Sequence, residues 1–195
     1  MKYFLVLAAN YLLGSIPSAY LVGRLKGIDI RQHGSGNPGA TNAFRVLGKG
    51  AGIVVLLVDC LKGVLGVILA QRIGNLWFTV FAALLVMVGH NYPIFLRFKG
   101  GKGVAAAAGI VLVLTPKVIL IETAFFILVV AITKYVSLGS LTVAVTIPII
   151  FFVIGEPLPI KILGFVAAAF VIYRHLPNIK RLIAGKESKI TDRMK

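Results

Sequence analysis

The sequence predicts an all-α integral membrane protein with seven transmembrane helices, its N-terminus outside and its C-terminus cytoplasmic. The first observation is composition: 58% of the 195 residues are hydrophobic and 14% are charged, with a mean hydropathy of +0.96, whereas about a quarter of a soluble domain is charged. The second is that apolar stretches close to the roughly 20 residues that cross a bilayer recur along the whole chain. The third is an excess of 21 Lys and Arg over 6 Asp and Glu, concentrated in a few loops and the tail.

The apolar stretches divide the chain into candidate spans. Five spans of ordinary length are predicted at 3–23, 51–70, 75–95, 139–155 and 160–176. The remaining stretch, 104–133, is too long for one ordinary span, and Thr115-Pro116-Lys117 interrupts it. Because a proline can end one helix or start the next, this stretch is either one long kinked helix or two short helices.

The basic residues favour two helices there. With two helices, one side of the membrane receives the loops 24–50 and 97–103, Lys134 and the tail 174–195, which carry five, three, one and seven basic residues. The other side receives only four, Lys2, Arg72, Lys117 and Lys161. Basic loops stay in the cytoplasm, so seven spans are predicted, and residues 1–195 are interpreted as one polytopic membrane domain with a cytoplasmic-face active site.

The first polar segment is His33–Gly50, HGSGNPGATNAFRVLGKG. Gly34–Gly39 has the spacing GxGxxG, and Asp59 follows twenty residues later, as in dinucleotide-binding proteins. That interpretation is rejected, because a membrane span precedes the glycines and Asp59 lies inside the next span. The glycines nevertheless permit left-handed backbone angles that turn consecutive N–H groups toward an anion. The polar side chains beside them are Ser35, Asn37, Thr41, Asn42 and Arg45.

The alternative for this segment is a flexible loop in which Gly34 and Gly36 only turn the chain. Arg45 would then serve only as a topology determinant.

The second polar segment is Phe98–Gly103, FKGGKG. It lacks the first glycine and the final Ser or Thr of the nucleotide-binding P-loop, because Leu96 and Gly103 stand at those positions. It places Lys99 and Lys102, with Gly100, Gly101 and Gly103, just before a predicted helix that starts at Val104. A cation beside a helix N-terminus suits a phosphate group. The alternative is that the lysines only mark the cytoplasmic side.

The third polar segment is Arg174–Glu187, RHLPNIKRLIAGKE. His175, Asn178 and Arg181 are three residues apart and are expected on one helix face. Glu187 is one of only six acids in the chain; it either forms a surface salt bridge or orients a cation in the site.

Some polar residues lie within the spans. Asp59 and Lys62 are three apart on one helix and are expected to form a structural ion pair. His90, at the end of the third span, is either a structural hydrogen-bonding group or a base, and Ser140 opens the sixth span together with Ser137.

The chemistry that these residues support is electrostatic. No metal site is expected, because neither the acids nor the three histidines have metal-ligand spacing, and no cofactor is predicted. A serine-hydrolase elbow and the H-x₄-D box of soluble acyltransferases are both absent. Single Cys60 excludes an internal disulfide, and nucleic acid is not an expected partner. Anion-binding groups without strong bases suit an already activated electrophile whose leaving group is an anion.

Three stretches resemble the signature regions of the bacterial acyl-phosphate:glycerol-3-phosphate acyltransferases, the PlsY family. They are GSGNPGATNAFRVLGKG, GHNYPIFLRFKGGKGVA and RHLPNIKRLIAGKE, and GSIPSAYLVGRL and DCLKG match as well. The resemblance covers essentially the whole chain. It departs mildly at Leu176-Pro177, where the family is usually more basic.

The resemblance implies acyl transfer from acyl phosphate to the sn-1 hydroxyl of glycerol 3-phosphate, the first step of phospholipid synthesis, in the bacterial cytoplasmic membrane. It implies that Ser35, Arg45 and Lys102 are catalytic. Together with the residue-level interpretation, it gives an acyl-phosphate loop of Gly34, Ser35, Gly36, Asn37, Thr41 and Asn42. The groups expected to bind glycerol 3-phosphate are Arg45, Lys102, His175, Asn178 and Glu187. Further candidates are His90, Gly100, Gly101, Gly103, Asp59, Lys62 and Ser140.

Two other functions compete with this one. A transporter for an organic phosphate would also use glycines and intramembrane charges, but its site would lie near the bilayer midplane between repeats. A purely structural membrane subunit leaves the clustering of glycine and asparagine unexplained. The predicted partners are therefore the two substrates and the lipid bilayer; the sequence leaves the choice between monomer and oligomer open.

Overall fold

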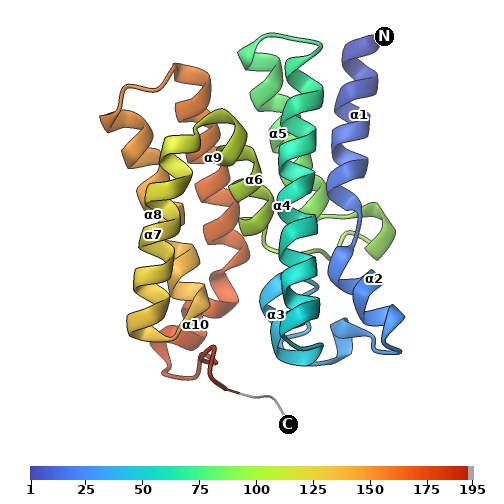
Figure 1. The fold of residues 1–195 in the computed structure, drawn as a ribbon, viewed down its shortest axis with the longest axis vertical. Helices are drawn as coiled ribbons and strands as arrows, with labels where there is room; N and C mark the ends of the chain where they lie inside the picture. The colour runs from blue at the N-terminus through green and yellow to red at the C-terminus, as the bar shows by residue number, and fades with distance from the viewer. Residues whose placement is uncertain (193–195) are drawn as a thin grey trace.

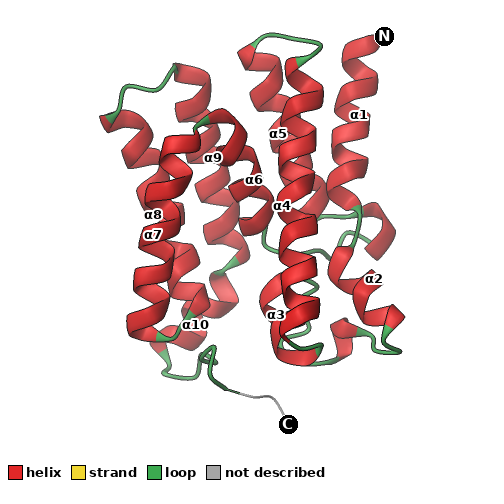
Figure 2. Ribbon diagram, in the orientation of Figure 1, coloured by secondary structure: helices red, strands yellow, loops and turns green. Residues whose placement is uncertain are grey.

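The computed structural model describes residues 1–192, and every regular element in that range is helical (Figures 1 and 2). The all-α prediction is thereby confirmed. The α-helices are α1 Lys2–Ser15, α2 Ser18–Leu25, α3 Ala40–Val46, α4 Lys49–Gln71, α5 Leu76–Asn91, α6 Val104–Leu114, α7 Pro116–Thr133, α8 Val136–Val153, α9 Leu158–Arg174 and α10 Leu176–Ile183. Two 3₁₀ turns, η1 Ile30–Gln32 and η2 Ile94–Leu96, complete the elements.

The helix lengths bear on the number of spans. Within residues 1–192, four helical segments are long and apolar enough to cross a membrane, and the number rises to six if each bent pair counts as one span. The bent pairs are α1 with α2, at 42°, and α9 with α10, at 58°. Helix α6 has 11 residues, about 16 Å, against a hydrocarbon core of about 30 Å. The count of seven therefore remains a prediction.

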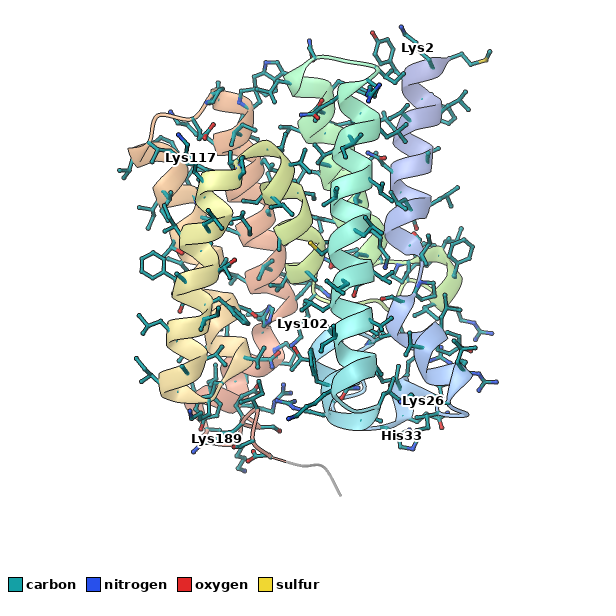
Figure 3. The ribbon with its side chains drawn as sticks, in the orientation of Figure 1. Lys2, Lys26, His33, Lys102, Lys117 and Lys189 are labelled. Carbon is teal, nitrogen blue, oxygen red and sulfur yellow. The ribbon has the colours of Figure 1, made fainter. Side chains whose placement is uncertain are left out.

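The stretch 104–133 does form two helices, and the chain reverses between them (Figure 1). Pro116 occupies the first turn of α7, where its missing N–H costs nothing. Figure 3 places Lys2 and Lys117 toward one end of the bundle and Lys26, His33 and Lys189 toward the other, with Lys102 between. This arrangement agrees with the grouping of basic residues deduced from the sequence.

Glycines bring neighbouring helices into backbone contact. A Cβ atom on Gly109 of α6 would lie 1.9 Å from the Cys60 carbonyl oxygen of α4, and one on Gly63 would lie 2.2 Å from the Ala106 oxygen. Small residues allow such close helix packing where the solvent is lipid and no hydrophobic force drives association. The contact fixes the short helix α6 against α4.

We expect Gly63→Ala to lower the thermal unfolding midpoint of the purified protein, because the added methyl group would overlap the Ala106 carbonyl of α6. Overpacking of this kind typically costs about 1–3 kcal/mol. Gly50→Ala is the matched control in the same helix, since a Cβ there meets nothing within 4 Å. Equal unfolding midpoints for the two variants would contradict the packing argument.

Candidate active site

One cavity of about 460 Å³ receives residues from all three polar segments. The polar side chains that line it include Ser35, Asn37, Thr41, Asn42, Arg45, Lys102, His175, Asn178, Arg181 and Glu187. Segments separated by more than a hundred residues therefore meet at one place in the fold.

The cavity has a polar end and an apolar arm. Along α8 its lining changes from Ser137 and Ser140, near the first turn, to Val143 and Ile147 further along. Along α9 the order is reversed: Ala168 and Val171 come first, and His175 follows the last residue of that helix. An elongated molecule with a charged head and a hydrocarbon tail matches this division.

The backbone of the first polar segment is sharply bent. Gly34 has φ of 64° and Gly36 has φ of 70°, both left-handed, whereas Gly39 is extended at −134°. A Cβ on Gly36 would lie 3.1 Å from the Arg31 carbonyl oxygen. Neither Gly34 nor Gly36 lines the cavity. Their contribution is to shape the loop.

Asn42 holds that loop from inside. Its side chain is 1% exposed, it accepts a hydrogen bond from the Ser35 N–H at 3.0 Å, and its amide donates to the Ile30 and His33 carbonyls. The Gly36 N–H also donates to His33. The Ser35 and Gly36 N–H groups, which were expected to be free to bind an anion, are thus hydrogen-bonded within the loop, and the hydrogen bonds of the Asn42 side chain are also made there. The loop therefore lines the cavity with side chains, among them those of Ser35 and Asn37.

Arg45 lies in the last turn of α3 with a guanidinium that is only partly satisfied. Its Nη2 donates to the Ser188 carbonyl at 2.9 Å, while its buried Nε has no hydrogen-bond partner among the described residues. Burial lowers the pKa of Arg45, although the negative charge of Glu187 opposes that effect. A buried donor without a partner, beside a cavity, favours an anion there.

Lys102 is the cation that enters the cavity from the second polar segment. Its ammonium group donates to the Asn178 side-chain oxygen. Burial lowers the pKa of Lys102 to about 8; Glu187 opposes the shift, and Arg181, Arg45 and Arg174 add to it. A negatively charged ligand would restore the full charge on this lysine.

Glu187 orients the groups around Lys102. Its carboxylate accepts from the Asn178 amide at 2.6 Å and from Arg181 Nε at 2.7 Å. Burial alone would raise the pKa of Glu187, but the hydrogen bonds from Asn178 and Arg181 outweigh it, so the pKa is lowered. With its amide donating to Glu187, Asn178 turns its oxygen toward Lys102. The geometry fits the second sequence interpretation, in which Glu187 orients cations.

The histidines differ in their surroundings. His175 is 2% exposed, and its Nδ1 lies 2.8 Å from the Val171 carbonyl oxygen, which assigns the ring proton to Nδ1. His90 also lines the cavity, but its Nδ1 lies 3.7 Å from Asp59 and its other nitrogen packs against Gly101. His33 is not among the cavity residues.

The glycines of the second polar segment position Lys102, and Gly103 also lines the cavity. Gly100 and Gly101 donate to the Asn91 and His90 carbonyls, and a Cβ on either would overlap the His90 residue. Gly103 has φ of 84° and caps α6.

Arg174 completes this anchoring, and the sequence interpretation did not identify it. Its guanidinium donates to the Gly100 carbonyl at 2.7 Å and the Gly101 carbonyl at 3.0 Å. Only its position next to His175 could have drawn attention to it.

Asp59 and Lys62 form the predicted ion pair, with 2.6 Å between Nζ and Oδ1. Ser18 donates to the same carboxylate oxygen at 2.6 Å, and Lys62 donates to the Ile16 carbonyl at the break between α1 and α2. These contacts support the structural role.

Ser140 lines the cavity, and its hydroxyl donates back to the Val136 carbonyl at 3.0 Å. Within residues 1–192, no group of three or more His, Cys, Asp and Glu side chains is arranged to hold a metal ion.

Comparison with known proteins identifies the family. Residues 4–185 match the family model described as glycerol-3-phosphate acyltransferase. Relatives with that name include one from Synechococcus elongatus, 47% identical over 94% of this chain and 92% of its own. Another, glycerol-3-phosphate acyltransferase 2 from Moorella thermoacetica, is 50% identical over 98% and 99% of the two chains.

Two solved structures have the same fold. They are crystal structures of PlsY, an integral membrane glycerol 3-phosphate acyltransferase, in a glycerol 3-phosphate form and a lysophosphatidic acid form. The first superimposes with a TM-score of 0.94 at 39% identity over 97% of this chain and 96% of its own. The second gives 0.91 at 38% identity over 97% and 95%. This chain is therefore an all-α integral membrane enzyme that belongs to the glycerol-3-phosphate acyltransferase family.

Proposed function

We propose that this protein transfers a fatty acyl group from acyl phosphate to the sn-1 hydroxyl of glycerol 3-phosphate, giving lysophosphatidic acid and inorganic phosphate. The observation that carries the proposal is the division of one cavity into a cationic end and an apolar arm. The phosphate head of acyl phosphate fits the cationic end, and its acyl tail fits the apolar arm. Glycerol 3-phosphate contributes a second phosphate group, which accounts for more than one cation.

The residue roles follow from position. Ser35, with Asn37 and Thr41, faces the phosphate of the acyl donor, while Gly34, Gly36 and Asn42 hold the loop that presents them. Arg45 and Lys102 offset negative charge on the two phosphate groups as the transition state forms. His175 and Asn178 position glycerol 3-phosphate, and Glu187 orients Asn178 and Arg181.

The reaction needs little beyond positioning. The acceptor oxygen bonds to the acyl carbon, the bond from that carbon to the phosphate oxygen breaks, and phosphate leaves with the electron pair. Preorganised cations in a partly buried site stabilise such charge strongly. The hydroxyl proton passes to the phosphate of the acceptor, whose second pKa near 6 suits the role. His90, held between Asp59 and Gly101, is then a structural residue.

The proposed setting is the bacterial cytoplasmic membrane. The chain crosses it as seven spans in one domain, residues 1–195, with the N-terminus outside and the polar end of the cavity facing the cytoplasm. Most of the lysines and arginines belong to the loops and the tail at the end of the bundle that holds Lys26 and Lys189 in Figure 3, and this excess supports the orientation.

The proposed activity predicts that the purified protein converts acyl phosphate and labelled glycerol 3-phosphate to labelled lysophosphatidic acid. Lys102→Ala and Arg45→Ala should each lower kcat/KM by roughly 10²-fold, the usual cost of removing one electrostatic contact to a transition state. Lys99→Ala is the matched control, because Lys99 is exposed in the same loop and should change the rate less than about threefold. Equal losses for Lys99 and Lys102 would mean that these lysines act only through total charge.

The bent loop predicts that Gly36→Ala raises KM for acyl phosphate at least about fivefold. The backbone of an alanine is strained at φ of 70°, and its Cβ would approach the Arg31 carbonyl. The loop must then shift, and Ser35 shifts with it. Gly27→Ala is the control, since Gly27 also has a positive φ, 71°, but its Cβ would meet nothing within 4 Å. The same rise in KM for both variants would trace the effect to general backbone strain.

The lowered pKa of Lys102, about 8, predicts a pH dependence. Lysine is charged below its pKa, so kcat/KM, which reports the free enzyme, should fall as pH rises through about 8. Arginine stays charged throughout, so Lys102→Arg should lose this decline even if its absolute rate is lower. An identical alkaline decline in Lys102→Arg would assign it to another group.

A further inference from the structure

Glu122 is a buried acid in the apolar arm of the cavity. It lies on α7, is 1% exposed, and lines the cavity together with Ile119 and Ile147. Among the described residues no Lys, Arg or His forms a salt bridge with it. A carboxyl group inside a membrane-spanning helix is costly and usually has a function, and the reaction proposed above does not use it.

Among residues 1–192, the hydrogen-bond partner of Glu122 is one hydroxyl group, that of Thr146. Thr146 Oγ1 on α8 lies 2.9 and 2.8 Å from the two carboxyl oxygens and 3.0 Å from the Thr142 carbonyl. A threonine hydroxyl can donate to one carboxyl oxygen and accept from a protonated one, so Thr146 holds Glu122 in place. The carboxyl group is nevertheless a polar group in a wall that is largely apolar at this level.

The position of Glu122 along the arm is fixed by its neighbours on α8. Phe126, one turn further along α7, packs beside Gly139, at the level of the polar end, whereas Glu122 meets Thr146. Thr146 is six residues beyond Ser140, about 9 Å along the helix. Ile119, one turn beyond Glu122, is the last cavity residue of α7 at this end. Glu122 is thus close to the far limit of the arm.

We propose that Glu122, braced by Thr146, sets the longest acyl chain that the enzyme accepts readily. This inference rests on the proposed function, because it takes the apolar arm to hold the acyl tail. A tail that reaches Glu122 places methylene groups against a polar carboxyl group, where they gain less than against an apolar wall. A tail that stops short of it does not.

The test compares two substitutions of similar size over acyl phosphates from decanoyl to octadecanoyl. Glu122→Leu makes the far end of the arm apolar. The Thr146 hydroxyl keeps a hydrogen-bond partner in this variant, because it can still donate to the Thr142 carbonyl. The chain length with the highest kcat/KM should move to longer tails, with a gain of roughly fourfold for each additional methylene buried. Glu122→Gln keeps a polar group there and should retain the wild-type profile.

Ratios of kcat/KM between chain lengths do not depend on the fraction of folded enzyme, so a less stable variant still gives an answer. Glu122→Met serves as a second apolar variant if Glu122→Leu accumulates poorly. Unchanged profiles in the apolar variants, with only a lower unfolding midpoint, would overturn the inference and leave Glu122 as a structural link between α7 and α8. If the wild-type enzyme forms no lysophosphatidic acid from any acyl phosphate, the proposed function itself is wrong.

Discussion

A half-buried ammonium group inside an apolar bundle is the constraint around which the rest of the site is arranged. An unpaired charge so placed would cost several kcal/mol, and the Asn178 oxygen and the nearby charge of Glu187 reduce this cost for Lys102. Asn178 can present that oxygen because Glu187 takes its amide, and Arg181 in turn balances Glu187. One acid in the tail thus controls how a cation from another part of the chain is held.

The loop that carries Lys102 depends on a second set of contacts. Its glycines approach the end of α5 so closely that no side chain fits, and their carbonyls are tied to Arg174. Arg174 immediately precedes His175, which lines the cavity. The end of α9 therefore holds the lysine loop with one residue and lines the active site with the next, so the two halves of the site are fixed relative to each other.

Much of this could be predicted from the sequence because lipid imposes simple rules. Apolar length and basic loops indicated an all-helical membrane protein, and Pro116 marked the division between α6 and α7. The three polar segments were visible because glycine, asparagine and lysine are conspicuous among apolar residues. Contacts were not visible. The internal role of Asn42, the anchoring by Arg174 and the backbone contact at Gly63 all depend on which segments meet, and local patterns do not encode that. The shortness of α6 was also missed, since an apolar run does not reveal how deep its first residue lies.

That shortness has a consequence for the electrostatics of the site. Because α6 is only about half as long as the hydrocarbon core is thick, the ammonium group before it lies well inside the bundle, between the two groups of surface lysines in Figure 3. Mobile ions screen exposed charges over about 8 Å at physiological ionic strength, but buried charges much less. The attraction between Lys102 and an anion in the cavity is therefore screened less by dissolved salt than the attraction exerted by the exposed lysines.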